Sequence, residues 1–334
     1  MFVWGSIMML MALVRNAAAL IAARFFLVRI KSQSAYGIGK LENKGGLTAW
    51  QWIFLLEGAP TVCLAVLTFF FLADFPAKAK WLNQCEKDLL ADRLRKDADV
   101  INDDEGEMSW KQIKSAFLDW QVLFYMLIYI STVTPVYGLN LFLPTIINDM
   151  GYSVANTQLL TIPPYVVSCV ITILVSWNSG RMEERGYHIS SLLLIGICGF
   201  LYLILSKNVA LYFGAFIACI GSLTLSSLIL SWATNNIGGQ TKRTVVTALV
   251  VGFGNIGGIL SGFIYGIEND SPYYHKGHCI MLGFMCCAFL LLLVFKFLLT
   301  CENSRREKLT HEQFALEAVV SRFSDKHPRF RYIT

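Results

Sequence analysis

The sequence predicts an all-α protein that crosses a lipid bilayer several times. Of its 334 residues, 55% are hydrophobic and only 15% are charged, whereas about a quarter of the residues in a soluble domain carry charge. Lys and Arg gather in alternate connections between apolar stretches, as they do in proteins threaded repeatedly through a membrane. The lipid bilayer is therefore the expected surrounding of most of the chain.

Seven apolar stretches are each long enough to form a membrane-spanning helix, since about 20 residues cross roughly 30 Å of hydrocarbon. The apolar residues 1–28 are different, because Arg15 and Arg24 interrupt them. A charge near the bilayer centre is costly, so two half-length pieces are expected there. The seven stretches lie near 53–72, 122–146, 157–177, 190–206, 209–231, 245–266 and 279–300.

The distribution of Lys and Arg predicts the orientation in the membrane. The connection 73–121 holds eight of them and the tail after Cys301 holds seven, whereas the connections on the opposite side hold only Lys207 and Lys276. By the positive-inside rule, the long connection and the C-terminus face the cytosol. The net charge of +5 is explained in this way, so no nucleic-acid partner is expected. The predicted location is the plasma membrane, with multiple passes.

The apolar stretches and basic connections divide the chain into four segments, two of which are expected to lie outside the bilayer. Apolar residues recur at helical spacing between Trp81 and Leu90, and a second short helix is expected over Ser109–Asp119. These helices either lie against the inner membrane face or dock a regulator. A further helix is expected to begin near Thr310. The segments are the N-terminal membrane part (1–72), the cytosolic connection (73–121), the six-span part (122–300) and the cytosolic tail (301–334).

The residue types that carry catalysis or hold metals are not grouped in this sequence. The nine cysteines lie mostly inside apolar stretches, where free Cys behaves as a small apolar residue. No pair has the C-x-x-C spacing of a zinc site, and the five histidines are scattered. We therefore expect neither an enzyme nor a protein with a metal or other cofactor.

A glycine-rich string within 245–266 resembles a nucleotide-binding motif only in its letters. Gly252, Gly254 and Gly257 match G-x-G-x-x-G, but that motif requires a preceding strand, and here it lies in an apolar helix. Gly254, Gly258 and Gly262 are spaced at i and i+4 and predict close packing of two membrane helices. Asn255 would then face the bundle, as a hydrogen bond between helices or as a ligand contact.

Two of the predicted spans contain prolines and polar aromatic residues. Pro135 and Pro144 lie within 122–146, and Pro163-Pro164 lie in the next span. Proline in a membrane helix frees backbone carbonyls that neighbours or a wet cavity must satisfy. These spans therefore either line a cavity or form kinked helices in a packed bundle.

Several strings together resemble the fungal allantoate permease family, the anion:cation symporters of the major facilitator superfamily. The resemblance runs from about residue 36 to the C-terminus, and its most specific string is Trp232–Arg243. The other strings are Gly46–Gly58, Asp74–Pro76, Phe142–Ile147, Pro163–Tyr165, Gly254–Gly258, Pro272–Tyr274, Gly277-His278 and Phe330–Tyr332.

The resemblance implies a fold of twelve helices in two six-helix halves that alternate access around a site at mid-membrane depth. On that fold, this chain has the complete C-terminal six-helix half and a truncated N-terminal half. The implied activity is transport of a small organic anion, of the allantoate, ureide or vitamin carboxylate class, together with protons. The alternatives are a non-transporting truncated paralogue or subunit and, from the number of spans alone, a seven-helix receptor.

The same resemblance implies where the substrate and the coupling proton would bind. Arg24 is a cation that pairs with an anionic substrate or with an acidic residue of the protein. Glu57 is the candidate proton carrier, or else a structural ion pair at the membrane edge. Tyr137 and Asn140 lie one helical turn apart and are expected to hydrogen-bond a carboxylate or an amide. The remaining candidates for substrate binding are Asn255 and the adjacent Asn235 and Asn236, which as alternatives cap a cytosolic helix end.

Overall fold

The computed structural model describes most of the C-terminal two thirds of the chain. The predicted span 53–72 and the candidates Arg24 and Glu57 lie outside the described residues. A short helix covers 84–90, within the stretch that was expected to be helical. The described residues are 83–90, 110–182, 184–206, 209–266, 273–320, 325 and 327–334.

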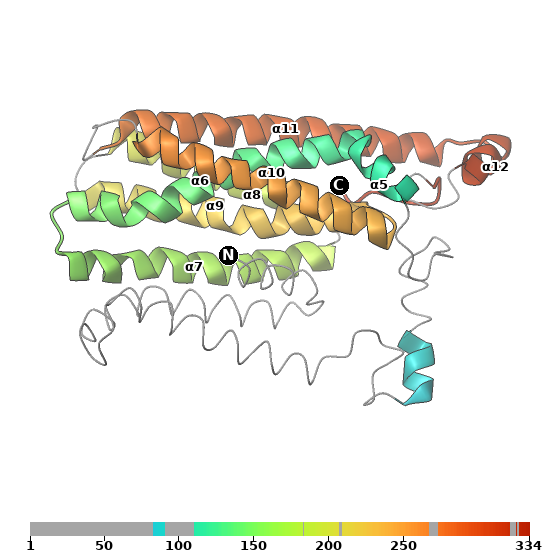
Figure 1. Ribbon diagram of the computed structural model, residues 1–334, viewed down its shortest axis with the longest axis horizontal. Coiled ribbons are helices and arrows are strands. Elements are labelled where there is room, and N and C mark those ends of the chain that lie inside the picture. Colours follow the sequence, from blue (N-terminus) through green and yellow to red (C-terminus); the bar gives the residue numbers. More distant parts are fainter. Residues whose placement is uncertain are drawn as a thin grey trace.

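Six long helices, each long and apolar enough to cross a membrane, dominate the described part. They confirm the six spans that the sequence predicts after residue 121, and most are several residues longer than predicted. Figure 1 shows them side by side along one axis. They are α6 (Trp120–Asp149), α7 (Val154–Met182), α8 (Gly186–Leu205), α9 (Val209–Asn236), α10 (Gln240–Gly266) and α11 (His275–Glu307).

Two shorter helices and the C-terminal residues gather at one end of the bundle (Figure 1). The helices are α5 (Trp110–Phe117) and α12 (His311–Val320). We call this the tail end, because Asp325 and residues 327–334 pack against it. Asp119 caps α6 here, with its carboxylate accepting a hydrogen bond from the backbone N–H of Gln121 at 3.2 Å.

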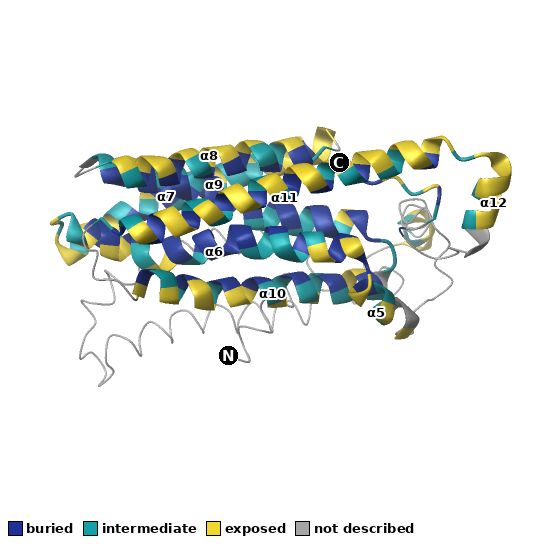
Figure 2. Cartoon of the chain, turned by 90° about the horizontal axis from the view of Figure 1, so that it is seen from above, coloured by how far each residue is buried: buried dark blue, intermediate teal, exposed yellow. Residues whose placement is uncertain are grey.

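The helices pack around an apolar core in which α6 is central. It contacts α10, α11, α9 and α7, while α8 packs against α9 and α11. Near the tail end, the rings of Tyr125, Trp232 and Phe295 lie 4.8 to 5.5 Å apart between centroids and fill the space between three helices. Figure 2 shows exposed residues along the outer faces of α10 and α11. Leu290 and Phe297 are among them, as suits a surface in contact with lipid.

Glycines set the close approach of α10 to α6, and two of the three predicted positions, Gly254 and Gly258, take part. A Cβ added at Gly254 would overlap the ring of Tyr129, and one added at Gly257 would lie 2.5 Å from the hydroxyl of Thr134. Gly262, the third residue of the predicted face, meets no described atom within 4 Å. The packed face therefore includes Gly257 and ends before Gly262.

The prolines of α7 show how a freed carbonyl is satisfied. Pro164 has no N–H to donate to the carbonyl of Leu160, four residues earlier. The hydroxyl of Tyr212, from α9, donates to that carbonyl at 2.9 Å. A neighbouring helix thus replaces the missing bond, as the membrane interior requires.

Candidate functional site

The first polar pair of the candidate site joins α6 to α10. The hydroxyl of Tyr137 donates to Oδ1 of Asn255 at 2.9 Å. Both residues were candidates from the sequence, and the structure brings them together. Gly258 makes the pairing possible, because a Cβ there would lie 3.1 Å from the ring of Tyr137.

A second pair joins α6 to α7. The hydroxyl of Tyr165 donates to Oδ1 of Asn140 at 2.9 Å. Sequence analysis named Asn140 but not Tyr165, although Tyr165 follows Pro163-Pro164. A phenol hydroxyl near the middle of an apolar span was the signal that could have identified it.

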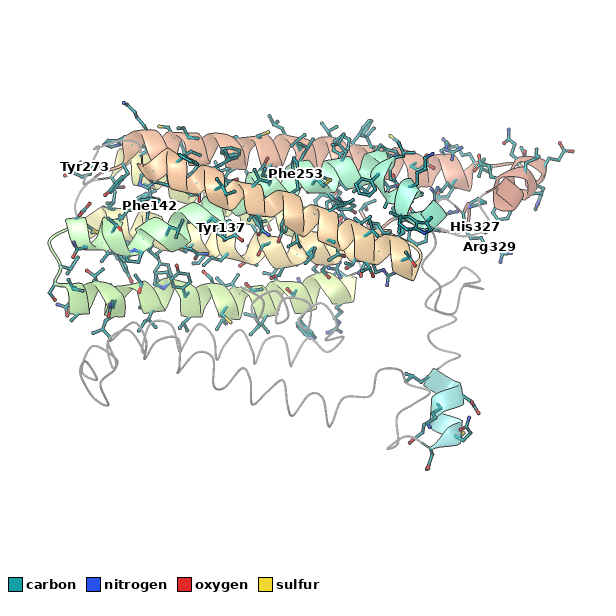
Figure 3. The ribbon with its side chains drawn as sticks, in the orientation of Figure 1. Tyr137, Phe142, Phe253, Tyr273, His327 and Arg329 are labelled. Atoms are coloured by element: carbon teal, nitrogen blue, oxygen red, sulfur yellow. The ribbon has the colours of Figure 1, made fainter. Side chains whose placement is uncertain are left out.

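The two pairs lie close to the middle of their helices. Tyr137 is within one turn of the midpoint of α6, and Asn255 and Tyr165 are within one turn of the midpoints of α10 and α7. Asn140 lies one further turn along α6. Figure 3 shows Tyr137 in the central part of the bundle, with Tyr273 toward one end and His327 at the other.

Each pair involves an exposed asparagine whose amide nitrogen is not used in the bond to tyrosine. Asn140 and Asn255 are exposed side chains, and each accepts its tyrosine hydroxyl through Oδ1. Within the described part of the chain, Nδ2 of each has no hydrogen-bond partner. An Asn NH₂ group offers two donors, so the arrangement presents uncharged donors to an acceptor such as a carboxylate or a carbonyl.

Charge is absent from the centre of the described spans. No Asp, Glu, Lys or Arg lies within one turn of the midpoint of any of the six long helices. Lys296, on α11, is nearer the tail end and pairs with Glu184 at 2.6 Å. In the described ranges, no group of three or more His, Cys, Asp or Glu could hold a metal ion. The polar groups near mid-span in the described helices are thus uncharged.

The adjacent candidates Asn235 and Asn236 lie at the tail end, away from the two polar pairs. Asn235 is exposed, on the last turn of α9. Asn236 is fully buried, and its amide binds the backbone of Ile333 and the hydroxyl of Tyr125. Its hydrogen-bonding groups are therefore engaged by the protein itself, which sequence spacing could not show.

A third polar cluster lies at the end opposite the tail. The hydroxyl of Tyr265 and Nδ1 of His278 are 2.9 Å apart, and Tyr274 donates to Asp149 at 2.8 Å. His278 is fully buried, and Nε2 has no partner among the described residues. These contacts join the ends of α6, α10 and α11 that lie away from the tail end.

The six apolar helices define a multi-pass membrane protein, with polar pairs near mid-span. The family model described as Major Facilitator Superfamily matches residues 4–262. The chain belongs to this superfamily.

Curated relatives include several fungal transporters. The chain is 34% identical to "MFS transporter prlL" of a fungal species, over 75% of this chain and 51% of that protein. It is 31% identical to an uncharacterised transporter of Schizosaccharomyces pombe (90% and 59%) and 28% identical to the high-affinity nicotinic acid transporter of Saccharomyces cerevisiae (90% and 56%). The chain thus spans somewhat more than half the length of these relatives.

Proposed function

We propose that the six-helix bundle is the C-terminal half of a transporter of small organic anions, and that the polar pairs bind the substrate's carboxylate. The observation that carries this proposal is the exposure of two amide NH₂ groups, from Asn140 and Asn255, near mid-span. A carboxylate that accepts from such donors forms charge-assisted hydrogen bonds, which are stronger than neutral ones. Tyr137 and Tyr165 orient the amides by donating to their oxygens.

The proposed substrate class is that of the allantoate permease family, namely ureides and vitamin carboxylates. The strings that resemble this family support it. So does the likeness to a relative whose name describes nicotinic acid transport. An aromatic carboxylate such as nicotinate would place its ring against the tyrosine rings and its carboxylate oxygens toward the asparagine amides.

The proposed mechanism is alternating access with proton symport. In this superfamily the site lies between the two halves at mid-membrane depth, and the described half supplies neutral donors there. Positive charge for the anion is assigned to Arg24 and the coupling proton to Glu57, both from the N-terminal part. We further propose that the protein resides in the plasma membrane with the tail end in the cytosol, as the Lys and Arg distribution supports.

Uptake by yeast cells that lack their own permeases for nicotinate and allantoate tests the proposal. We expect cells that express the chain to take up at least one of the two anions saturably. Asn255→Ala should raise KM about tenfold, since loss of one hydrogen bond to a charged group costs roughly 1.5 kcal/mol or more. Tyr137→Phe should raise KM less, because it removes the bond that orients the Asn255 amide and not a bond to the substrate.

Thr247→Ala is the matched control for the uptake experiment. Thr247 is a half-buried polar residue of α10, two turns before Asn255, and its hydroxyl bonds within its own helix, to the carbonyl of Arg243. Its removal should leave KM unchanged. Uptake no greater than in cells without the chain, or KM values unaffected by Tyr137→Phe and Asn255→Ala, would refute the proposal.

A further inference from the structure

The last residues of the chain lie as an extended segment between α9 and α11 at the tail end. Asn303, on α11, binds both backbone groups of Tyr332: its Nδ2 donates to the carbonyl at 2.8 Å, and its Oδ1 accepts from the N–H at 3.0 Å. Asn236, on α9, does the same for Ile333, at 2.9 and 2.8 Å. Two asparagine amides therefore hold two successive residues through their main chain.

Three further N–H groups donate hydrogen bonds to the main chain of the tail. Nε1 of the buried Trp232 donates to the carbonyl of Ile333 at 2.7 Å. The backbone N–H groups of Arg185 and Gly186, where α8 begins, both lie 3.2 Å from the carbonyl oxygen of Thr334. The polar groups of a buried main chain must find hydrogen-bond partners. Here the partners are side chains and the backbone N–H groups at the start of α8, whereas in a sheet they would be the backbone of a neighbouring strand.

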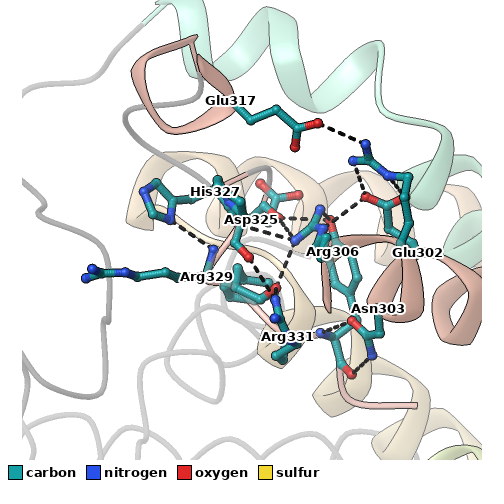
Figure 4. Close-up of polar contacts among 12 residues, drawn as sticks. Glu302, Asn303, Arg306, Glu317, Asp325, His327, Arg329 and Arg331 are labelled. Carbon is teal, nitrogen blue, oxygen red and sulfur yellow. Dashed lines mark hydrogen bonds and ion pairs between the residues drawn. The ribbon is translucent and has the colours of Figure 1, made fainter. Parts of the chain in front are cut away.

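One tail side chain is recognised specifically. The ring of Tyr332 is almost fully buried, and burial raises the pKa of its phenol to about 12. Its hydroxyl accepts from Nη2 of Arg306 at 2.8 Å and donates to the carbonyl of Asp325 at 2.9 Å. Arg306 also donates to the carbonyl of Phe330 at 2.9 Å. Figure 4 shows Arg306 at the centre of these contacts.

A buried ion cluster links the tail to two more helices. Nζ of Lys242, on α10, lies 2.6 Å from Asp119, which caps α6, and 2.8 Å from Asp325 of the tail. Burial raises the pKa of the Asp325 carboxyl, and the Lys242 ammonium opposes that shift. One cation thus holds together the start of α6, the start of α10 and the tail.

We propose that the tail end of the bundle contains a docking slot for an extended peptide, and that residues 330–334 of this chain occupy it as a strap. The slot binds the main chain of the strap through the side chains of Asn236, Asn303 and Trp232. The buried side chain of Tyr332 anchors the strap. Docking of the strap ties the tail-end termini of α8, α9 and α11 together, and Asp325 adds those of α6 and α10 through Lys242, so that these helices move as one body. Release of the strap frees them.

Hydrogen–deuterium exchange of the full chain in detergent, followed by mass spectrometry, tests this proposal without any transport assay. We expect the amides of Tyr332 and Ile333 to exchange at least about 100-fold more slowly than in a free peptide with the sequence of residues 327–334, because stably bonded amides exchange only on opening. Asn236→Ala and Asn303→Ala should each speed this exchange about tenfold, because each removes a pair of bonds.

Asn235→Ala is the matched control, since Asn235 is the same residue type, adjacent and exposed, and its loss should leave tail exchange unchanged. Asn303 lies in the last turns of α11, and Tyr332 lies in the tail. Asn303→Ala and Tyr332→Ala therefore test the slot even if Asn236→Ala does not fold. Tail amides of the unmodified chain that exchange at the rate of the free peptide would overturn the proposal. So would tail exchange that is unchanged in both Asn303→Ala and Tyr332→Ala.

Discussion

Lys242→Met is expected to lower the free energy of unfolding by about 3–5 kcal/mol, because it removes the cation from a buried cluster of charges. The side chains of Lys242, Asp119 and Asp325 are each no more than 2% exposed. Without the ammonium, two carboxylates would remain buried close together and repel each other. Thermal and denaturant unfolding of the purified chain in detergent, monitored by intrinsic fluorescence, would measure the loss.

Two further variants test whether the loss of stability comes from the buried ion cluster. Lys308→Met makes the same chemical change at an exposed residue and should alter stability by less than about 0.5 kcal/mol. Asp325→Asn, added to Lys242→Met, should restore part of the loss because it removes one buried charge. Equal stabilities for Lys242→Met and Lys308→Met would show that the cluster does not hold the tail end together.

Gly221→Leu is expected to prevent α8 and α9 from packing. A Cβ at Gly221 would overlap the backbone of Gly196, and a Cβ at Gly199 would overlap the backbone of Ala218. Backbone atoms cannot rotate away as a side chain can, so the helices must separate. We expect destabilisation of about 3 kcal/mol or more, at or above the upper end for overpacked cores. The yield of monodisperse protein in size-exclusion chromatography should fall accordingly.

Gly262→Leu is the control for this substitution. It also adds a leucine to a glycine of a long helix, but a Cβ at Gly262 meets no described atom within 4 Å. Its yield should stay close to that of the unmodified chain. If Gly221→Leu and Gly262→Leu gave the same yield, the close contact between α8 and α9 would not be needed for folding.

The six described spans were predictable because hydrocarbon thickness fixes the length of an apolar helix. Which face of each helix meets a neighbour was less predictable. Gly254 and Gly258 pack against α6 as expected, but Gly257 contacts α6 too and Gly262 meets no described atom within 4 Å. Helix rotation depends on all the neighbours of a helix, and a single periodic pattern does not contain that information.

In the site, too, some features could be predicted from the sequence and others could not. Tyr137 and Asn255 stood out as polar residues in apolar spans, but the bond between them joins residues 118 positions apart, and no spacing rule connects such positions. Asn236 was a candidate just beyond a predicted span, yet it binds Ile333, 97 positions later. Polar residues in a membrane span could thus be found from sequence, whereas their partners required the packed bundle.

Equilibrium binding of labelled nicotinate or allantoate to the purified chain tests most directly whether the mid-span pairs form an anion-binding surface. The account predicts saturable binding of at least one of these anions, weaker binding of a neutral amide analogue such as nicotinamide, and a rise of about tenfold in Kd with Asn255→Ala. Thr247→Ala should leave Kd unchanged. Binding of the anion with the same Kd in the Asn255→Ala and unmodified chains, or no saturable binding of either anion, would contradict it.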